Sequence, residues 1–288
     1  MAMSARTSPV GDELAGRFDD VRPLRSRPPF VLFEARERPG GRRVVVKVPD
    51  GVRHLWVDGL LRTQATLLGR IGSHPHVIGV LDSFTLDDGR PALVLEHATG
   101  SPRDAVTAAP EPLRAAIATG IKLAGALETV HAADALHCDV RPDNVFTTDV
   151  GEPVLGGFDE AVSTAPDASR FPQHVITAYT APELLEGAAP SPATDVYGLA
   201  ATLYELVAGH AAFREYAGES AATVIVRVLG GQVQPIVAPD VPIEVSDLLT
   251  WAMSADATKR PPTPAWFAEE LARIELRQGW PRTHLVTG

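Results

Sequence analysis

Short apolar runs separated by turn residues fill the first hundred residues and predict a small sheet. Residues 30–35 and 43–48 are rich in β-branched and aromatic side chains, and a Pro-Gly-Gly sequence between them predicts a hairpin turn. Residues 77–84 and 91–96 form a second pair around an Asp-Asp-Gly turn. Between the pairs, apolar positions at three- and four-residue spacing over residues 58–71 predict an amphipathic helix. The predicted order is therefore two strands, a helix and two strands.

Helical spacing dominates the rest of the chain. Apolar residues recur at steps of three and four over residues 112–131, 191–209 and 264–277, which predicts helices there. A hairpin is expected at residues 145–155, around an Asp-Val-Gly turn. Residues 1–16 are small and polar and are expected to be flexible. The pattern as a whole predicts an α+β fold, with a small β-rich part followed by a larger, mainly helical part.

A polar segment, residues 137–145, lies between the first of these helices and the hairpin; we call it the Asp139 loop. It places a carboxylate (Asp139), a cation (Arg141) and a carboxamide (Asn144) within six residues. Pro142 has no backbone donor and biases the residue before it away from helical geometry, so the segment is expected to be irregular. Loops dense in such groups commonly carry catalytic residues.

The Asp139 loop begins His-Cys-Asp-Val-Arg-Pro-Asp-Asn and resembles the catalytic loop of eukaryotic-type serine/threonine protein kinases, H-R-D-x-x-x-x-N. The resemblance implies that Asp139 is the catalytic base and that Asn144 binds a metal ion. Arg141 holds the position that lysine usually occupies in that family.

The resemblance also implies a two-lobed protein-kinase-like fold. Residues 17–99 would form a β-rich small lobe with one main helix, and residues 100–278 a larger, mainly helical lobe. Residues 279–288 would follow as a C-terminal tail.

Three further residues match positions that have structural roles in the family. Glu183 ends the sequence Ala-Pro-Glu, and Arg260 lies in Asp-Ala-Thr-Lys-Arg-Pro, which resembles the family's D-P-x-x-R-P. The resemblance implies that these two residues form a buried ion pair. Asp195 lies near the start of the helix at residues 191–209 and is suited to accepting hydrogen bonds from backbone N–H groups.

The nucleotide-binding positions are only partly matched. Lys47, one of three lysines, resembles the strand lysine that pairs with ATP phosphates, the alternative being a cation that points to water. The glutamate that holds this lysine is replaced by Gln64, which accepts a hydrogen bond but supplies no charge. Leu95, Glu96 and Ala98 match the hinge whose backbone meets the adenine.

The glycine-rich phosphate loop of the family is missing. No glycine occurs over residues 17–39, and Pro28 and Pro29 lie where such a loop would wrap the phosphates. A cradle of backbone N–H groups is therefore not expected. Arg25 and Arg27 would attract phosphate only through their side chains, and surface charge is the simpler role for both.

The metal-binding aspartate of the family is displaced. The sequence Gly156-Gly157-Phe158-Asp159 puts glycine at its position and a carboxylate two residues later, a shift of about 6–7 Å in an extended segment. Metal coordination tolerates errors of only tenths of an ångström, so Asp159 would ligate a metal only after a rebuilding of the backbone that the two glycines permit. The alternative is that Asp159 is solvated or pairs with an arginine.

Cys138 replaces an arginine that in the family usually receives a phosphorylated activation segment, so this form of control is not expected. Its side chain is expected to be a small buried thiol. As the only cysteine, Cys138 excludes an internal disulfide and fits a reducing compartment.

Composition narrows the classes of partner. The net charge of -10 disfavours a nucleic-acid partner. The N-terminus lacks the apolar core of a signal peptide, and the longest apolar stretch, residues 196–213, is interrupted by Glu205 and is too polar to span a membrane. The chain is therefore expected to be soluble and cytoplasmic, with neither a nucleic acid nor a membrane as its partner.

Our first hypothesis is a pseudokinase, a regulatory or protein-binding module that engages a partner protein and binds ATP weakly or not at all, without dependence on Mg²⁺. The alternative is an active atypical serine/threonine kinase in which Asp139 is the base and Asn144, with Asp159 or Asp149, holds the metal. Arg141 would then keep a cation near the transferred phosphoryl group. A third hypothesis, a kinase-fold enzyme with different nucleotide chemistry, has no positive feature in the sequence.

Overall fold

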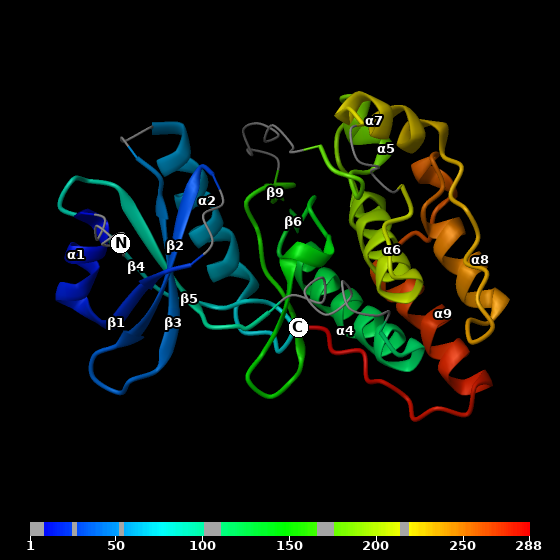
Figure 1. The fold of residues 1–288 in the computed structure, drawn as a ribbon, viewed down its shortest axis with the longest axis horizontal. Helices are drawn as coiled ribbons and strands as arrows, with labels where there is room; N and C mark the ends of the chain where they lie inside the picture. The colour runs from blue at the N-terminus through cyan, green and yellow to red at the C-terminus, as the bar shows by residue number, and fades with distance from the viewer. Residues whose placement is uncertain (1–8, 25–27, 52–54, 101–110, 166–175, 214–218) are drawn as a thin grey trace, which may run out of the picture. The chain divides into compact units, whose positions relative to one another are not determined.

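The computed structural model describes residues 9–24, 28–51, 55–100, 111–165, 176–213 and 219–288 (Figure 1). The chain divides into two compact units. The first unit runs to Gly72 and also contains residues 78–98, whereas the second contains residues 73–77 and everything from Thr99 onward. The first unit is built on a sheet and the second mainly on helices, so the predicted α+β class is confirmed.

The first unit contains a five-stranded antiparallel sheet with the strand order β1-β2-β3-β5-β4. Its elements are helix α1 (Pro9–Arg17), strands β1 (Phe18–Pro23), β2 (Phe30–Glu37) and β3 (Arg43–Pro49), helix α2 (Leu55–Ile71), and strands β4 (Val80–Thr85) and β5 (Pro91–Glu96). The four strands and the helix predicted from the sequence are present, and β1 is an additional edge strand.

The central strand β3 is buried on both faces, and its alternating side chains meet different helices. Val44, Val46 and Val48 join a core cluster with Leu14 of α1. Lys47 points to the opposite face, where it hydrogen-bonds to α2. Successive side chains of a strand point to opposite faces, so α1 and α2 cover the two sides of one sheet, as Figure 1 shows.

Helix α1 corrects one prediction. Residues 1–16 were expected to be flexible, but residues 9–16 are helical and Leu14 is fully buried. Glu13 accepts a hydrogen bond from the Asp87 backbone N–H at 2.7 Å, and the Arg17 guanidinium lies 4.0 Å from the centre of the Phe84 ring. The sequence prediction was wrong because so short a helix is stabilised by packing on the sheet, which local composition does not show. Residues 1–8 lie outside the described part.

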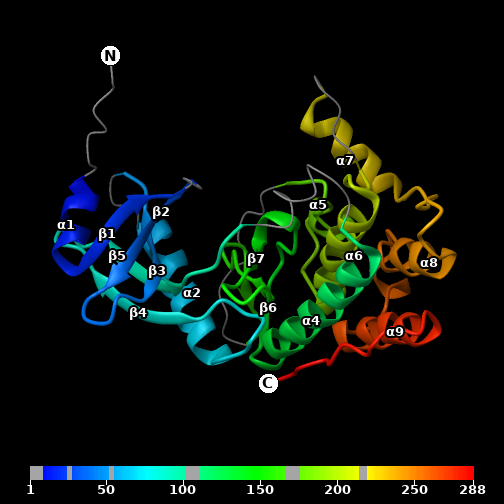
Figure 2. The same ribbon diagram turned by 60° about the horizontal axis from the view of Figure 1, so that its bottom comes forward.

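The second unit is organised around helices α4, α6 and α9, with α4 packed against both of the others (Figures 1 and 2). Its helices are α4 (Leu113–Ala132), α5 (Pro182–Leu185), α6 (Pro192–Ala208), α7 (Ala221–Gly230), α8 (Ile243–Ala252) and α9 (Pro264–Arg277), with 3-10 turns η1 (Pro142–Asn144) and η2 (Ala257–Lys259). Its strands are β6 (Ala135–Leu136), β7 (Val145–Thr147), β8 (Pro153–Leu155) and β9 (Val162–Ser163). The predicted hairpin is the β7–β8 pair.

Helix α6 is buried around nearly its whole circumference, which makes it the central element of this unit. Pro192 occupies its first turn, and the Ser191 backbone N–H donates to the Thr194 hydroxyl at 2.9 Å. Gly209 ends the helix in the left-handed region, with φ of 76°. None of the described helices is both long enough and apolar enough to cross a membrane.

We expect Leu14→Ala to lower the free energy of unfolding by about 2–5 kcal/mol, because the substitution empties a fully buried site between α1 and the sheet. Urea unfolding followed by circular dichroism measures the change. Gly16→Ala is the matched control on the same helix, since an added methyl group would meet no atom within 4 Å there. Equal stability of the two variants would show that α1 is not part of the folded core.

Candidate functional site

The Asp139 loop is held by one buried carboxylate, that of Asp195 in the first turn of α6. One of its oxygens accepts the His137 backbone N–H at 2.9 Å, and the other accepts the Cys138 backbone N–H at 2.7 Å. The His131 ring Nε2 lies 2.7 Å from the same carboxylate. Burial raises the pKa of Asp195, but the hydrogen bond and charge of His131 outweigh it, so the pKa is lowered overall. The predicted role of Asp195 in accepting backbone N–H groups is confirmed.

His137 connects the Asp139 loop to the segment that follows the β7–β8 hairpin. Its Nδ1 accepts the Asp139 backbone N–H at 3.2 Å, and its Nε2 lies 2.9 Å from the Gly156 carbonyl oxygen. These partners assign the ring hydrogen to Nε2 in a neutral imidazole. Complete burial lowers the pKa of His137, which agrees with the neutral form. The ring also packs edge-on against Phe158, with 4.5 Å between the ring centres.

The three polar side chains predicted for this loop are brought together. Asn144 is completely buried, and its Nδ2 donates to the Asp139 carboxylate at 2.6 Å and to the Asp139 carbonyl oxygen at 2.8 Å. The Arg141 Nε lies 3.4 Å from the same carboxylate oxygen. The carboxylate of Asp139 is thus engaged by an amide and a guanidinium of its own loop. The roles of base, cation and metal ligand remain predictions.

The backbone at Gly157 leaves no room for a side chain. Gly157 has φ of 73°, in the left-handed region, and an added Cβ would lie 2.2 Å from the Asn144 Oδ1 and 2.3 Å from its Cγ. Real Cβ atoms do not approach so closely. Where the family resemblance requires a metal-binding carboxylate, the structure therefore has a glycine whose neighbouring space is filled by Asn144.

The magnesium site that the resemblance implied is matched only in part, because Gly157 has no side chain to ligate a metal. In the described part of the chain, no three His, Cys, Asp or Glu side chains gather in a way that could hold a metal ion. Asp159 follows Phe158 directly, is half-buried, and its charge acts on His137. Asn144, the retained candidate ligand, donates from Nδ2 to Asp139, and its Oδ1 faces Gly157.

The predicted lysine pairing in the first unit is confirmed. The Lys47 Nζ donates to the Gln64 Oε1 at 3.0 Å, and both side chains are buried. The Nζ also lies 4.3 Å from the centre of the Phe30 ring, within range of a cation–π interaction. Lys47 therefore does not point to water, and the pairing partner that the structure gives it on α2 is a neutral amide.

The residues predicted for the hinge and the phosphate loop lie at or beside the ends of strands. Their roles in ligand binding stay predictions. Leu95 and Glu96 end β5, and the Glu96 carboxylate accepts the Gly79 backbone N–H at 3.1 Å. Ala98 follows in an irregular segment. Pro29 lies beside the start of β2, where its carbonyl oxygen accepts the Asp50 N–H at 2.7 Å. Residues 25–27, including both arginines predicted there, lie outside the described residues.

The Cys138 thiol is not activated. Cys138 has φ of 62°, a conformation held by the hydrogen bond from its N–H to Asp195. Burial and neighbouring carboxylates raise the pKa of the thiol, so it stays protonated at neutral pH. The sequence predicted a small buried thiol, whereas Cys138 is only partly buried, because the Asp139 loop lies at the edge of the helical core.

The predicted ion pair of the second unit is confirmed. The Arg260 Nη1 and Nη2 donate to the two oxygens of Glu183 at 2.9 and 2.7 Å. Arg260 also donates to the Ser254 and Ala193 carbonyl oxygens, and the Thr194 hydroxyl donates to Glu183 at 2.8 Å. The arginine head is therefore satisfied by several acceptors, as a buried guanidinium requires.

A second buried pair, which the sequence did not predict, joins Tyr179 to Glu205. The Tyr179 hydroxyl donates to the carboxylate of Glu205 on α6, and both residues are buried. A signal was present in the sequence, because a carboxylate in the middle of an apolar helix requires a hydrogen-bond partner when it is buried. The partner came from a distant segment that spacing does not reveal.

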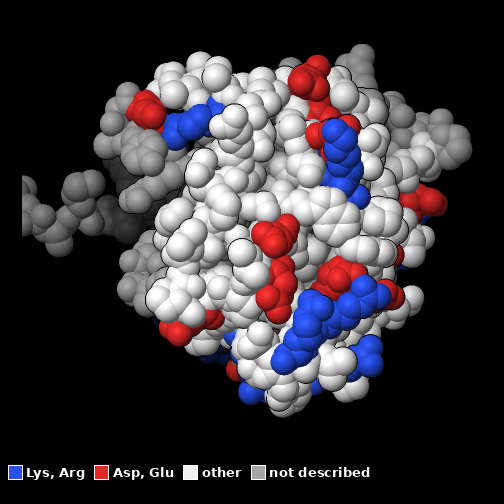
Figure 3. All heavy atoms as spheres, turned by 90° about the vertical axis from the view of Figure 1, so that its right-hand side faces the viewer, with Lys and Arg blue, Asp and Glu red and all other residues white. Residues whose placement is uncertain are grey.

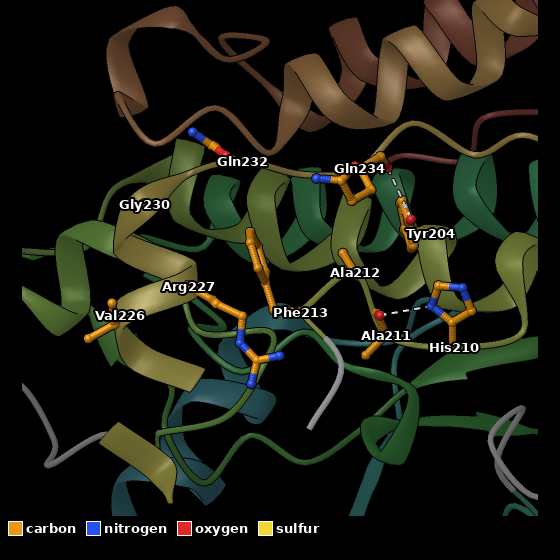
Figure 4. A pocket seen from close by; sticks show the side chains of 10 residues that line it. All are labelled: Tyr204, His210, Ala211, Ala212, Phe213, Val226, Arg227, Gly230, Gln232 and Gln234. Carbon is orange, nitrogen blue, oxygen red and sulfur yellow. Dashed lines mark hydrogen bonds between the residues drawn. The ribbon is translucent and has the colours of Figure 1, made fainter. Parts of the chain in front are cut away.

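A separate hollow of about 530 Å³ lies between the end of α6 and α7 (Figure 4). Tyr204 donates to the Gln234 carbonyl oxygen at 3.0 Å on one side, and Arg227 forms an ion pair with Glu219. None of the residues predicted for catalysis or nucleotide binding lines it. Its lining consists of Tyr204, His210, Ala211, Ala212, Phe213, Val226, Arg227, Gly230, Gln232 and Gln234.

Charges of both signs share one face of the second unit. Figure 3 shows Lys and Arg side chains beside Asp and Glu side chains there. Two of the ion pairs of this unit are Lys259–Asp256 at 3.5 Å and Arg277–Glu244 at 3.7 Å. Such exposed pairs contribute little to stability. The expectation that no nucleic acid binds remains a prediction.

Comparison with known proteins gives consistent matches. A family model described as "Protein kinase domain" matches residues 31–272. The chain is 33% identical over 278 residues to serine/threonine-protein kinase PknK of Mycobacterium tuberculosis, across 92% of this chain and 24% of the relative. It is 30% identical over 289 residues to PknA of the same organism, across 95% of this chain and 64% of that protein. A probable serine/threonine-protein kinase of Clostridium perfringens is 28% identical over 274 residues, across 92% of this chain and 39% of that protein. The chain thus spans about a quarter of the length of PknK.

We expect Gly157→Ala to lower the free energy of unfolding by about 2–4 kcal/mol, because the new Cβ adds left-handed backbone strain and collides with Asn144. Thermal unfolding measures the loss. Gly59→Ala on α2 is the control, since a Cβ there meets nothing within 4 Å and removes a helix-disfavouring glycine. A Gly157→Ala protein as stable as the control would show that Asn144 does not occupy the described position.

The Glu183–Arg260 pair should make stability depend on pH. Burial raises the pKa of Glu183, but the Arg260 hydrogen bonds and charge lower it more, so the pKa is depressed overall. The ionised carboxylate therefore stabilises the fold above its unfolded pKa of about 4.3, and this stabilisation is lost as pH falls through the folded value.

The stability difference between the wild type and Glu183→Gln should accordingly be largest near pH 7 and shrink below about pH 4. Urea unfolding of both proteins across this range measures it. Glu269→Gln, at an exposed position of α9, should show no such trend. A difference that is constant with pH would contradict the ionised pair.

Proposed function

Because the chain belongs to the protein kinase domain family, we propose that it acts as a pseudokinase, a regulatory or protein-binding module with weak or no Mg²⁺-dependent ATP binding. Membership of the family establishes the kinase-like fold expected from the sequence. The observation that carries the proposal is the arrangement at Gly157, where Asn144 fills the space next to a position without a side chain.

Phosphoryl transfer depends on metal ions that neutralise charge and on exact positioning of the reacting groups. Here one metal-binding position is a glycine, and the second, Asn144, is bonded to Asp139 at 2.6 Å. This hydrogen bond is made by the amide nitrogen and leaves the Asn144 Oδ1 facing Gly157, so a metal held by that oxygen would lack the carboxylate that the family places at Gly157. The arrangement favours a closed loop over a metal site.

The lysine side of the site supports the same proposal. Lys47 is held by the neutral Gln64 and by the face of Phe30. The glutamate that the family resemblance implies at the position of Gln64 would supply a negative charge to this hydrogen bond, and Gln64 supplies none. The phosphate loop of the family is also replaced by a proline-containing segment without glycine. The groups that would grip a triphosphate are therefore weakened in several independent ways.

By contrast with the groups that would bind phosphate, the ion pair and the carboxylate contacts that maintain the fold of the second unit are fully formed. The Glu183–Arg260 pair and the Asp195 contacts are buried, well aligned and fully hydrogen-bonded. These contacts stabilise the second unit and do not handle phosphate. A chain that keeps its scaffold and loses its metal site suits a role in binding a partner protein.

An active serine/threonine kinase is the second candidate, and two observations favour it. Asp139, Arg141 and Asn144 lie together as a base, a cation and an amide would. The relatives described above carry the name serine/threonine-protein kinase. In this alternative ATP and Mg²⁺ would be required, and Asp139 would accept the proton of the substrate hydroxyl.

We expect ATP at 1 mM, with or without Mg²⁺ or Mn²⁺, to change the Tm of the protein little. A site with a Kd of about 10 µM would add roughly 2.7 kcal/mol of stability under these conditions, enough for a shift of several degrees. Thermal unfolding with each metal and a metal-free control measures the shift. A large shift that requires the metal would contradict the pseudokinase proposal.

Transfer of radiolabelled phosphate to the protein itself or to a generic basic protein separates the two candidates. The pseudokinase proposal predicts no label above that of Asp139→Ala. Label that the wild type transfers and Asp139→Ala does not would establish the kinase. Asp159→Asn then tests whether the shifted carboxylate takes part, since only a metal ligand at that position would make transfer depend on it.

A further inference from the structure

The residues after α9 form an ordered segment that returns along the second unit. Figures 1 and 2 show this C-terminal segment, in red, running from α9 back beside α4. Glu275, which is 1% exposed, accepts the Thr283 N–H at 2.8 Å and the Thr283 hydroxyl at 2.6 Å. At its other end, the Gly288 N–H donates to the Thr129 hydroxyl of α4 at 2.9 Å.

A glycine in α4 permits this close approach. An added Cβ at Gly125 would lie 2.1 Å from the Val286 carbonyl oxygen and 3.2 Å from the Leu285 side chain, and its three nearest atoms all belong to the segment. Glycine in the interior of a helix lowers helix stability. Its presence in the middle of α4 is explained by the backbone that passes over it.

The segment is bound mainly through its backbone. Leu285 and Val286 are 36% and 37% exposed, so their side chains add partial apolar burial to these backbone contacts. The His74 Nδ1 accepts the His76 N–H at 3.1 Å, which leaves the ring hydrogen on Nε2, 3.0 Å from the Val286 carbonyl oxygen. Gly125, Thr129 and His74 thus form a groove for an extended peptide backbone.

His74 belongs to the connection at residues 73–77, which follows α2 and lies in the second unit. The other side of this connection is held by β8, because the Leu155 N–H donates to the His76 carbonyl oxygen at 2.9 Å and the His76 Nδ1 lies 2.8 Å from the Pro153 carbonyl oxygen. The connection is therefore fixed between β8 and the C-terminal segment.

We propose that residues 283–288 act as a strap that fills this groove and fixes the connection at residues 73–77. The occupant is the chain's own segment, since it supplies a donor or acceptor to each of Glu275, Thr129 and His74. The strap is attached by hydrogen bonds at Glu275, Thr129 and His74 and by two side chains that are only partly buried, so it can detach without unfolding the helices beneath it. Its release would uncover a surface that binds extended peptides and would loosen the residues after α2.

The test uses variants of the whole 288-residue chain. Gly125→Ala should lower the Tm in the otherwise unchanged chain, because the methyl group collides with Val286. In a chain with the strap detached by Thr283→Pro and Gly288→Pro, which removes the donors to Glu275 and Thr129, the same substitution should raise the Tm by about 2–4 °C, since only the gain in helix propensity remains. Equal effects of Gly125→Ala in the two chains would overturn the proposal.

Gly120→Ala is the matched control on the same helix. Its Cβ would collide with Leu203 and Leu271 of the core, so it should lower the Tm equally whether or not the strap is attached. Hydrogen exchange at the His76 amide should become faster when the strap is detached, and unchanged exchange would overturn its role in fixing the connection. A concentration-dependent dimer that disappears in the detached chain would show instead that a second copy fills the groove.

Discussion

The geometry of the Asp139 loop depends on the buried carboxylate of Asp195. It accepts two successive backbone N–H groups and lies beside His131, so a residue of the central helix determines where the loop begins. Cys138 is kept in a left-handed conformation by this contact. Such a buried charge is tolerated because each of its oxygens accepts a hydrogen bond, and the loss of any donor would leave a charged group in an apolar interior.

Contacts that hold the scaffold and contacts that would handle phosphate differ in how completely they are formed. The Glu183–Arg260 pair is bidentate and surrounded by further acceptors, whereas Lys47 has the neutral Gln64 as its partner on α2. Gly157 also belongs to the second group of contacts. Asn144 occupies the space that a side chain at position 157 would need. Fold stability and phosphate chemistry therefore depend on separate sets of residues. The fold can stay stable while the capacity to bind phosphate is reduced.

Glycines explain two close approaches that are central to this structure. At Gly157 the missing Cβ lets the Asn144 amide sit against the backbone, and at Gly125 it lets the C-terminal segment cross α4. In α4 the helix accepts a residue with poor helix propensity at Gly125 in return for a tertiary contact, whereas at Gly157 the left-handed backbone itself favours glycine. Local helix preference gives no reason for glycine at position 125, and the passing C-terminal segment does.

The sequence by itself determined the order of the main strands and helices and the α+β class, because periodic apolar residues are local properties of the chain. The scaffold pair Glu183–Arg260 was implied by the resemblance to a known family. The same resemblance identified Gln64 as the partner of Lys47. Tertiary structure alone decided that residues 9–16 form a packed helix, that Tyr179 meets Glu205, and that Asn144 turns to Asp139 beside Gly157. These contacts join segments that pack in space or depend on the exact path of the backbone, and periodicity carries no information about either.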